Sequence, residues 1–386
     1  MFIQKSLIIG IILNCSTTAQ IIQDKSTLQQ DTLLFSDSAH HWYDINDYEK
    51  IITPHDNQKR YSLSEFTNIA DNILLYQKSN GGWPKNYDML AILTEDQKVS
   101  VLKSKNVLNT TFDNGATHSQ LNFLATVYYK TKLEKYREAF LRGINFILSA
   151  QYANGGWPQF YPDLSSYRKY ITFNDGAMIG IMKLLQKIIY NAELFPFIDS
   201  ILNNKIKSAY EKGIDCILNC QIMDNGELTA WCQQHDNIDF RPRNARSFEP
   251  ASISNRESSD IVKFLMTIKM PNKRIEHSII SAIIWFENSK IHGIRVDEVA
   301  DAKIDYQYHS TVSDKIVVAD SSAEPIWTRF NELGTWKPLF CNRDGKVVYK
   351  LADVERERRT GYAWYVYDPQ EVLDLYPAWL DKWIKK

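Results

Sequence analysis

The sequence predicts a mainly α-helical protein folded as an α/α toroid, an incomplete barrel of two helical layers, with a smaller irregular and partly β region. Two observations predict this fold class. A short motif returns at a nearly constant interval, and the segments between its copies have apolar residues at helical spacing. Self-similarity at a fixed period is typical of supersecondary units that stack on one another.

The repeated motif contains the string NGGWP. Residues 77–87 read QKSNGGWPKNY, and residues 151–161, which begin 74 positions later, read QYANGGWPQFY. A weaker third copy, QIMDNG, follows at residues 221–226. Glycine suits the position after a helix, where φ is often positive, and proline favours an extended residue before it. Each copy is therefore interpreted as a helix, a tight turn and a polar loop, and the loops are expected at one end of the stack.

Helices are expected wherever apolar residues recur three or four positions apart. In chain order these segments are residues 64–76, 121–129, 136–148, 177–190, 202–218 and 279–286. No clear hairpin of alternating strands is expected before residue 340. The spacing Gln-x-x-x-Gly-x-Trp in the first two copies resembles a motif of terpene cyclases, in which glutamine ties a helix end. The acidic cluster of a cyclase is missing, so this likeness supports only the toroid fold.

Composition places the chain among globular proteins, since 44% of its 386 residues are hydrophobic and 24% are charged. The net charge of −1 gives no overall field suited to nucleic acid or to an acidic polymer. Attraction for a polyanion would need a local basic patch. The length allows two domains, but a repeated architecture can hold residues 59–386 as one domain.

The first residues have the pattern of a secretory signal peptide over residues 1–20: a basic residue at Lys5, an apolar run at 7–13 and small residues at 17–19. The alternatives are an N-terminal core helix and a lipid anchor at Cys15. Residues 21–58 are expected to form a linker or partly ordered arm. The protein is expected to be secreted or periplasmic, because no other apolar run is long enough to span a membrane. The remaining four cysteines form no disulfide framework or CxxC metal site.

Two related turns carry the acidic candidates. Residues 111–117 read TFDNGAT and residues 172–178 read TFNDGAM, each before an apolar helix. Asparagine and aspartate lead the ranking of helix N-caps, so simple capping is one interpretation. Two matching acidic turns in a repeat fold also suggest that Asp113 and Asp175 meet across a groove and hold a hard cation. Ca²⁺ takes carboxylate and carbonyl oxygens in flexible geometry.

The basic candidates come late in the chain. Arg241, Arg243 and Arg246 fall within six positions, and a second group consists of Arg343, Arg356, Arg358 and Arg359. Arginine suits planar recognition of carboxylates, and a solvated charged face is the alternative. His235 precedes Asp236, but adjacent residues do not face each other in regular structure, so its role is structural or a substrate contact. No phosphate loop, nucleophile elbow or HExxH motif is present.

From about Tyr61 to the C-terminus the chain resembles the family ten polysaccharide lyases, which are pectate lyases. The resemblance lies in ordered motifs, at residues 80–86, 113–117, 151–162, 172–178, 229–236, 245–249, 325–345 and 357–362. It implies an α/α toroid and a secreted enzyme that cleaves polygalacturonate by β-elimination, giving unsaturated oligogalacturonates. Ca²⁺ is the implied cofactor, with no organic cofactor, nucleic acid or membrane span. The protein is expected to be a monomer.

The resemblance also implies roles for single residues. Asp113 and Asp175 would hold Ca²⁺ together with a substrate carboxylate, and Arg246 would be the Brønsted base, with Arg243 as the alternative. The implied substrate-binding residues are Lys85, Asn114, Asn174, His235, Arg343, Arg358 and Arg359. Many relatives have a second aspartate where this chain has Gly176, which leaves the complete Ca²⁺ ligand set open.

Two functions of other classes stay open on the residues alone. A glycoside hydrolase on the same toroid would use Asp113 and Asp175 as carboxylates about 5–9.5 Å apart. A non-catalytic glycan-binding protein would use the same rim without turnover. Endo or exo action, tolerance of methyl-esterified pectin and oligomeric state are not decided by the sequence.

Overall fold

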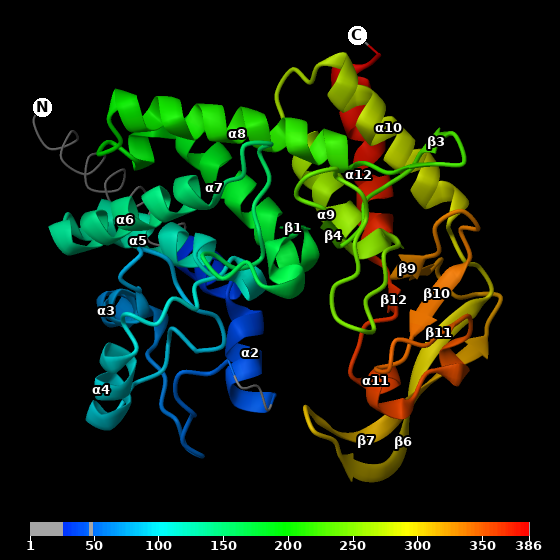
Figure 1. Ribbon diagram of the computed structural model, residues 1–386, viewed down its shortest axis with the longest axis horizontal. Coiled ribbons are helices and arrows are strands. Elements are labelled where there is room, and N and C mark those ends of the chain that lie inside the picture. Colours follow the sequence, from blue (N-terminus) through cyan, green and yellow to red (C-terminus); the bar gives the residue numbers. More distant parts are fainter. Residues whose placement is uncertain (1–25, 46–48, 386) are drawn as a thin grey trace, which may run out of the picture.

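The computed structural model describes residues 26–45 and 49–385. The expected signal peptide at residues 1–20 lies outside this part of the chain. Helices are the main regular structure of the described residues (Figure 1). The helices are α2 (Ser36–Asp44), α3 (Phe66–Tyr76), α4 (Glu95–Lys103), α5 (His118–Thr131), α6 (Glu134–Ala150), α7 (Ala177–Tyr190), α8 (Ser200–Cys220), α9 (Asn255–Met266), α10 (Lys273–Asn288), α11 (Arg356–Thr360) and α12 (Asp368–Trp383).

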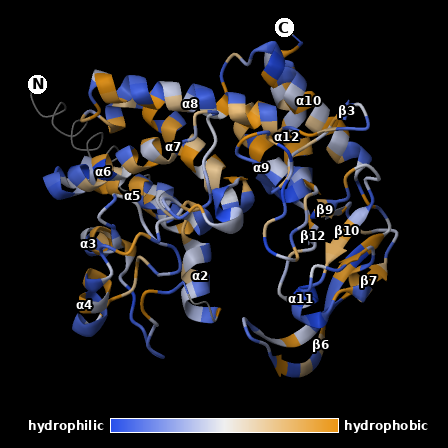
Figure 2. Ribbon diagram, in the orientation of Figure 1, coloured by the Kyte–Doolittle hydropathy of each residue, from blue (hydrophilic) through white to orange (hydrophobic). Residues whose placement is uncertain are grey.

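The long helices form two layers, which confirms the predicted toroid. In the inner layer α3 packs against α5, α5 against α7, α7 against α9 and α9 against α12. In the outer layer α6 packs against α8 and α8 against α10. The inner helices α5, α7 and α9 are buried on most of their surface, whereas α6 and α8 bury one face. Helix α8 has both hydrophobic and hydrophilic residues along its length, as expected of a helix with one buried face (Figure 2).

The repeated motif explains how the layers are joined. Gln77 donates its side-chain N–H bonds to the carbonyl oxygens of Gly81 and of Ala139 in the next outer helix, at 2.9 and 2.8 Å. Gln151 and Gln221 repeat this pattern with their own loops and with helices α8 and α10. Each glutamine therefore ties its loop to the following outer helix.

The tryptophan of each motif copy is the second tie. Trp83, Trp157 and Trp231 are buried, and their indole N–H groups donate to Ile73, Ile147 and Ile217 near the end of the preceding helix. Gly81, at φ +95°, lies so close to the outer helix that a Cβ atom would stand 2.5 Å from the Arg142 carbonyl oxygen. Glycine is needed here for both its backbone conformation and its size.

The loops also gather the acidic turns at one end of the toroid. Thr111 donates its backbone N–H to Trp83, and Phe112 donates to Gln159 in the next loop. The second turn repeats this arrangement with Trp157 and Gln233. Each turn is thus held between two consecutive motif loops. The prediction that the loops lie at one end is confirmed.

The strands are short except for one pair, and every pairing is antiparallel. They are β1 (Ile171–Thr172), β2 (Met223–Asp224), β3 (Glu227–Leu228), β4 (Gln234–His235), β5 (Ile253–Ser254), β6 (Ile294–Asp305), β7 (Ser310–Ala319), β8 (Trp327–Thr328), β9 (Phe330–Asn331), β10 (Pro338–Cys341), β11 (Val347–Val348) and β12 (Tyr365–Val366). The largest sheet has the order β11-β10-β9-β5. This C-terminal region is the partly β part of the prediction.

Two expectations from the sequence were wrong in detail. The long β6–β7 hairpin lies before residue 340, where no clear hairpin was expected. Its strands mix charged residues with exposed apolar side chains such as Val312 and Ile316, so they show no clean buried face. Helices α4, α9 and α12 were also not anticipated. The apolar residues of α4 are only Val99, Val101 and Leu102, and those of α9 are confined to residues 261–266, so neither gave a helical pattern over several turns.

The described residues of the predicted linker or partly ordered arm pack against the toroid. Leu28, Phe35 and Trp42 recur seven residues apart, and all three are buried in the main core. Helix α2 is further attached by a hydrogen bond of 2.7 Å from the Trp42 indole to Ile52. This spacing is a helical signal, diluted by the polar residues around it. Among the described residues, none of the helices has the length and apolar character needed to cross a bilayer.

Candidate active site

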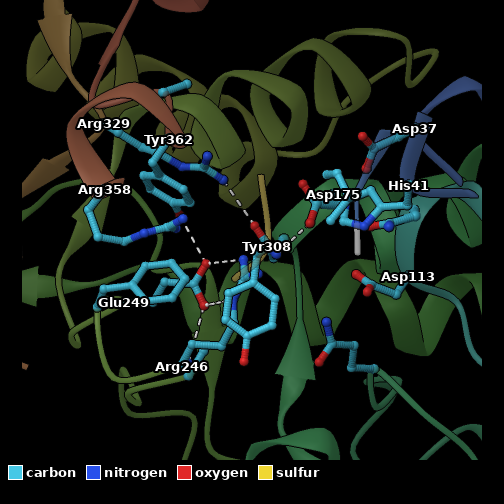
Figure 3. Close-up of a pocket in the computed structure, with 18 of the residues that line it drawn as sticks. Asp37, His41, Asp113, Asp175, Arg246, Glu249, Tyr308, Arg329, Arg358 and Tyr362 are labelled. Carbon is cyan, nitrogen blue, oxygen red and sulfur yellow. Dashed lines mark hydrogen bonds and ion pairs between the residues drawn. The ribbon is translucent and has the colours of Figure 1, made fainter. Parts of the chain in front are cut away.

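A cleft of about 750 Å³ lies between the N-terminal half of the toroid and the C-terminal β region. Carboxylates from α2 and from the two acidic turns form one wall, and arginines of the C-terminal half form the other (Figure 3). The titratable residues that line it are Asp37, His40, His41, Glu49, Lys85, Asp113, Tyr167, Asp175, Arg246, Glu249, Arg256, Tyr308, Lys315, Arg329, Arg343, Arg358 and Tyr362.

The acidic turns have the same backbone shape. Each is a short 3₁₀ turn, at Asp113–Gly115 and at Asn174–Gly176, and the two pack against each other. The middle residue has positive φ in both, +49° at Asn114 and +48° at Asp175. Asparagine and aspartate tolerate this region better than most residues. In this register Asp113 matches Asn174, so the two carboxylates occupy different positions of the turn.

Asp113 is fixed by a cation but keeps one bare oxygen. Its Oδ2 accepts from Lys85 Nζ at 2.7 Å, while Oδ1 is buried and has no hydrogen-bond partner among the described residues. Burial raises the pKa of Asp113, but the Lys85 ammonium outweighs burial and holds it below its usual value. Lys85 also pairs with Glu49 at 3.0 Å. Burial lowers the pKa of Lys85, yet the two carboxylates raise it well above the usual value, so the ammonium stays charged.

Asp175 has the opposite electrostatic environment. Burial and the negative charge of Asp113 raise its pKa to about 6. Asp37 of helix α2 adds to this repulsion. A carboxylate that resists ionisation beside another carboxylate gains most from a bound cation.

The acidic wall fits a hard cation only if part of the ligand set comes from elsewhere. Among residues 26–45 and 49–385, no three histidine, cysteine, aspartate or glutamate side chains are grouped to hold a metal by themselves. Asp113 and Asp175 supply two carboxylates, one of them with a buried free oxygen. This donor set suits Ca²⁺ with further oxygen ligands from water or a bound anion.

The basic wall is built around one aromatic ring. The guanidinium carbons of Arg246, Arg343 and Arg358 lie 4.8, 5.2 and 4.6 Å from the centre of the Phe248 ring. Arg343 and Arg358 are both clamped by Glu357, each with two hydrogen bonds of 2.6 to 2.9 Å. The predicted Arg343 and Arg358 therefore present fixed guanidiniums to the cleft.

Arg246 is clamped by a buried carboxylate. Its Nε and Nη2 donate to Glu249 at 2.8 and 2.6 Å, and the Tyr362 hydroxyl donates to the same carboxylate at 2.9 Å. Burial acts to lower the pKa of Arg246, but Glu249 raises it well above its usual value. Burial likewise acts to raise the pKa of Glu249, which Arg246 instead lowers to about 2. Nη1 has no hydrogen-bond partner among the described residues.

The structure brings most of the sequence-predicted residues together, but not all. Lys85, Asn114, Asn174, Arg343 and Arg358 line the cleft with Asp113, Asp175 and Arg246. The alternative base Arg243 instead pairs with Asp236 at 2.9 Å and does not line the cleft. Of the two arginines considered as a base, only Arg246 has access to a substrate there.

His235 and Arg359 are the predicted substrate-binding residues that do not reach the cleft. His235 is buried; its Nε2 accepts from the Cys232 N–H at 3.0 Å and its Nδ1 donates to the Phe240 carbonyl at 2.7 Å. Both ring nitrogens serve the backbone, which favours the structural role of this histidine. Arg359 forms two hydrogen bonds of 2.7 Å with Asp314. It therefore holds helix α11 against β7.

Several cleft residues were missed from the sequence. Asp37 and His41 come from the segment expected to be a linker or arm, and Tyr308 and Lys315 come from the hairpin that was not anticipated. Tyr308 lies 4.7 Å from the Arg343 guanidinium, ring centre to carbon. The spacing of Leu28, Phe35 and Trp42 was the available signal for the arm.

Proteins of one enzyme family are similar to this chain in sequence and fold. Residues 77–373 match the family model described as pectic acid lyase. A family 10 polysaccharide lyase from Cellvibrio cellulosa is 31% identical, with a TM-score of 0.67 over 82% of this chain and 92% of that one. An aspartate-to-alanine mutant of that organism's family 10 enzyme, in complex with trigalacturonic acid, is 29% identical, with a TM-score of 0.66 over 83% and 99% of the two chains. Among curated proteins, none matches this sequence.

Proposed function

The chain belongs to the pectic acid lyase family and is a pectate lyase, and from this premise we propose that it cleaves polygalacturonate by Ca²⁺-assisted β-elimination with Arg246 as the base. The single observation that carries the proposal is the charge distribution of the cleft: the acidic wall with Asp113 and Asp175 lies opposite the arginines around Phe248. The trigalacturonic acid bound by the Cellvibrio mutant supports polygalacturonate as the substrate.

The two walls divide the work of binding a uronate chain. Asp113 and Asp175 would hold Ca²⁺ together with the carboxylate of the reacting sugar. Bound there, the ion would supply Lewis-acid stabilisation of negative charge on that carboxylate. Arg343 and Arg358 would bind the carboxylates of neighbouring sugars through fixed guanidinium groups. Lys85 is already paired with Asp113 and Glu49, so its proposed contact with substrate would share an engaged ammonium.

The reaction breaks two bonds and forms one double bond. Arg246 would remove the proton from C5 of the reacting galacturonate, and the electron pair would form the C4–C5 double bond. The bond from C4 to the glycosidic oxygen would break. That oxygen would take a proton from solvent, and Arg246 would release the proton it had gained to solvent. The positive charges of Arg343 and Arg358 near Phe248 disfavour a third charge on Arg246, whereas Glu249 favours it. Alkaline pH should therefore be needed to populate the neutral base.

The remaining proposals concern the whole molecule. We propose that residues 1–20 are a signal peptide, that the enzyme is secreted or periplasmic, and that it acts as a monomer. Residues 59–386 would form the catalytic domain. Residues 21–58 would form the N-terminal arm, and the ordered part of this arm contributes Asp37 and His41 to the cleft wall.

The test is product formation from polygalacturonate with and without Ca²⁺. A lyase produces unsaturated uronates, which absorb in the ultraviolet, without consuming water. Chelator should remove this signal and added Ca²⁺ should restore it. Reducing ends without ultraviolet absorbance would indicate a hydrolase, and binding without any product would indicate a glycan-binding protein. Full activity after complete chelation would contradict the proposed cofactor.

A further inference from the structure

We infer that Arg329, held by Glu257, is a positioning residue that orients the carboxylate of Asp175 through the side-chain amide of Asn174. The sequence analysis assigned no positioning role to Arg329, Glu257 or Asn174. Asn174 was expected to bind substrate, and Arg329 and Glu257 were not anticipated at all. The inference rests on the proposed function of Asp175, and its test must therefore separate the two.

The anchor of this arrangement is a buried ion pair. Arg329 and Glu257 are each 3% exposed. Nη2 of Arg329 donates to Oε1 of Glu257 at 2.5 Å, and the guanidinium carbon lies 4.6 Å from the centre of the Tyr362 ring. A guanidinium fixed on one side by a carboxylate and on its face by an aromatic ring has little freedom to reorient.

The pair dictates which way the Asn174 amide points. Oδ1 of Asn174 accepts from Arg329 Nη2 at 3.0 Å and from Gln233 Nε2 at 2.8 Å. An arginine side chain has donors only, so the oxygen end of the amide must face Arg329. The amino end then faces the cleft, where Nδ2 donates to Oδ2 of Asp175 at 2.7 Å. A flipped amide would place N–H groups against N–H groups.

The matching turn shows what the amide adds. In the first turn Asp113 is directly ion-paired with the ammonium of Lys85, at 2.7 Å. In the second turn Asn174 occupies the equivalent position and stands between Arg329 and the carboxylate. The intervening amide orients the carboxylate by a hydrogen bond and leaves its negative charge available to the cleft.

The experiment uses two variants that act at different points of the arrangement. Asn174→Ser removes the amide but leaves the Arg329–Glu257 pair in place. Arg329→Lys keeps a charge beside Glu257, but an ammonium lacks the planar group that stacks on the Tyr362 ring and so fixes the nitrogen, Nη2, that bonds both Glu257 and Asn174. Arg142→Lys is the control, because Arg142 likewise donates to a side-chain amide oxygen, that of Gln77, but lies outside the cleft.

Each variant is assayed for kcat and KM on polygalacturonate, for the Ca²⁺ concentration at half-maximal rate, and for thermal stability with and without Ca²⁺. Misplacement of a reacting group by about 1 Å costs on the order of 100-fold in rate. We expect Asn174→Ser and Arg329→Lys each to lower kcat by about 10- to 100-fold, with KM within about threefold. Both should need more Ca²⁺ and show a smaller Ca²⁺-induced rise in melting temperature. Arg142→Lys should change none of these.

The double variant is the decisive arm. If Arg329 acts through Asn174, the double variant should have a kcat less than about threefold below that of Asn174→Ser alone. The reason is that Asn174→Ser has already removed the amide through which Arg329 acts. Full multiplication of the two effects would show that Arg329 acts by another route, and the inference would fail. If Arg329→Lys does not fold, wild-type kcat and Ca²⁺ dependence in Asn174→Ser would overturn the inference alone. An active Asp175→Asn would instead refute the proposed role of Asp175.

Discussion

Arg246 and Glu249 form a two-pronged ion pair, in which Nε and Nη2 of the guanidinium donate to the two carboxylate oxygens at 2.8 and 2.6 Å. Glu249 is 2% exposed and also accepts from the Tyr362 hydroxyl. The pair leaves only Nη1 of Arg246 without a partner among the described residues. The ion pair that orients Arg246 therefore also raises its pKa above the usual arginine value.

This relationship predicts that Glu249→Gln shifts the pH dependence of the rate. The Glu249 carboxylate stabilises the protonated guanidinium, so its loss lowers the pKa of Arg246 and increases the neutral fraction at a given pH. The alkaline rise of kcat should move to lower pH. Glu357→Gln is the matched control, since it removes a charge that clamps Arg343 and Arg358. That control should raise KM and leave the position of the rise unchanged. An unshifted profile in Glu249→Gln would argue against Arg246 as the base.

Replacement of Arg246 itself should separate catalysis from binding. If Arg246 is the base, Arg246→Ala removes nearly all turnover but leaves measurable binding of oligogalacturonate, which Arg343 and Arg358 still contact. If Arg246 only grips a carboxylate, binding weakens strongly and saturated turnover changes less. Arg246→Lys should keep partial activity at altered pH, because an ammonium has a lower pKa. The wild-type rate should rise toward alkaline pH, and a flat profile with an active Arg246→Ala would exclude the assignment.

The acidic wall predicts a cation requirement that depends on both turns. Asp113→Asn and Asp175→Asn should each lower activity at saturating substrate by at least about 100-fold, and raise the Ca²⁺ concentration needed for half-maximal rate. Asp113→Asn also leaves Lys85 with Glu49 as its remaining carboxylate, so it should lower thermal stability as well. Asp314→Asn, which removes the partner of Arg359 outside the cleft, should leave the Ca²⁺ requirement unchanged. Wild-type Ca²⁺ dependence in both turn variants would contradict the metal assignment.

The sequence predicted the toroid because the glutamine and tryptophan that join the helices of each repeat recur in the sequence at a fixed spacing. Gln77 and Trp83 are separated by the same interval as Gln151 and Trp157, and both pairs make the same bonds in the structure. The hairpin of β6 and β7 had no such signal, because both its faces are largely polar or exposed. Its contribution of Tyr308 and Lys315 to the cleft is a long-range contact, and single-sequence periodicity does not report such contacts.

The site was predictable where a side chain acts from its own motif. Asp113, Asp175 and Arg246 lie in recognisable strings and meet in the cleft. His235 lay in an equally recognisable string, yet its ring serves the Cys232 and Phe240 backbone. Arg329 and Glu257 lie 72 positions apart. Their pairing depends on the contact between Arg329, which lies between β8 and β9, and the start of α9, where Asn255 donates its backbone N–H to the Arg329 carbonyl. No local sequence pattern predicts this contact.

Packing against the repeated tryptophans predicts a graded effect of two alanine substitutions. A Cβ at Gly143 would stand 2.6 Å from Leu121 and 2.8 Å from the Trp83 ring. A Cβ at Gly213 would first meet the flexible Met182 sulfur at 2.4 Å, with the Trp157 ring at 3.2 Å. Alanine gains about 1 kcal/mol of helix propensity over glycine, and overpacking costs about 1–3 kcal/mol. Gly143→Ala should therefore destabilise the protein in denaturant unfolding, and by more than Gly213→Ala. A stabilised Gly143→Ala would contradict this packing.

The buried ring of His235 predicts a loss of stability in mildly acidic solution. Nε2 accepts from the Cys232 N–H, so a proton on Nε2 would face another N–H group, and burial lowers the pKa of His235 to about 4. The unfolded chain takes up this proton near pH 6.5, so between about pH 6.5 and 4 it binds more protons than the folded state does. Stability should fall as pH falls through this window, by at most about 1.4 kcal/mol per pH unit for this group.

The comparison with His235→Asn isolates this contribution. Asparagine keeps a donor for the Phe240 carbonyl but removes the titration, and the unmet Cys232 N–H should cost about 1–3 kcal/mol near neutral pH. His118, with a pKa lowered to about 4 by burial, acts in the same direction in both proteins, and Asp175, with its raised pKa, acts in the opposite direction in both. The difference in unfolding free energy between wild type and variant should therefore shrink from pH 7 to pH 4, in urea titrations at fixed ionic strength. A constant difference across this range would show that His235 is protonated in the folded protein and that its hydrogen bonds are not those described.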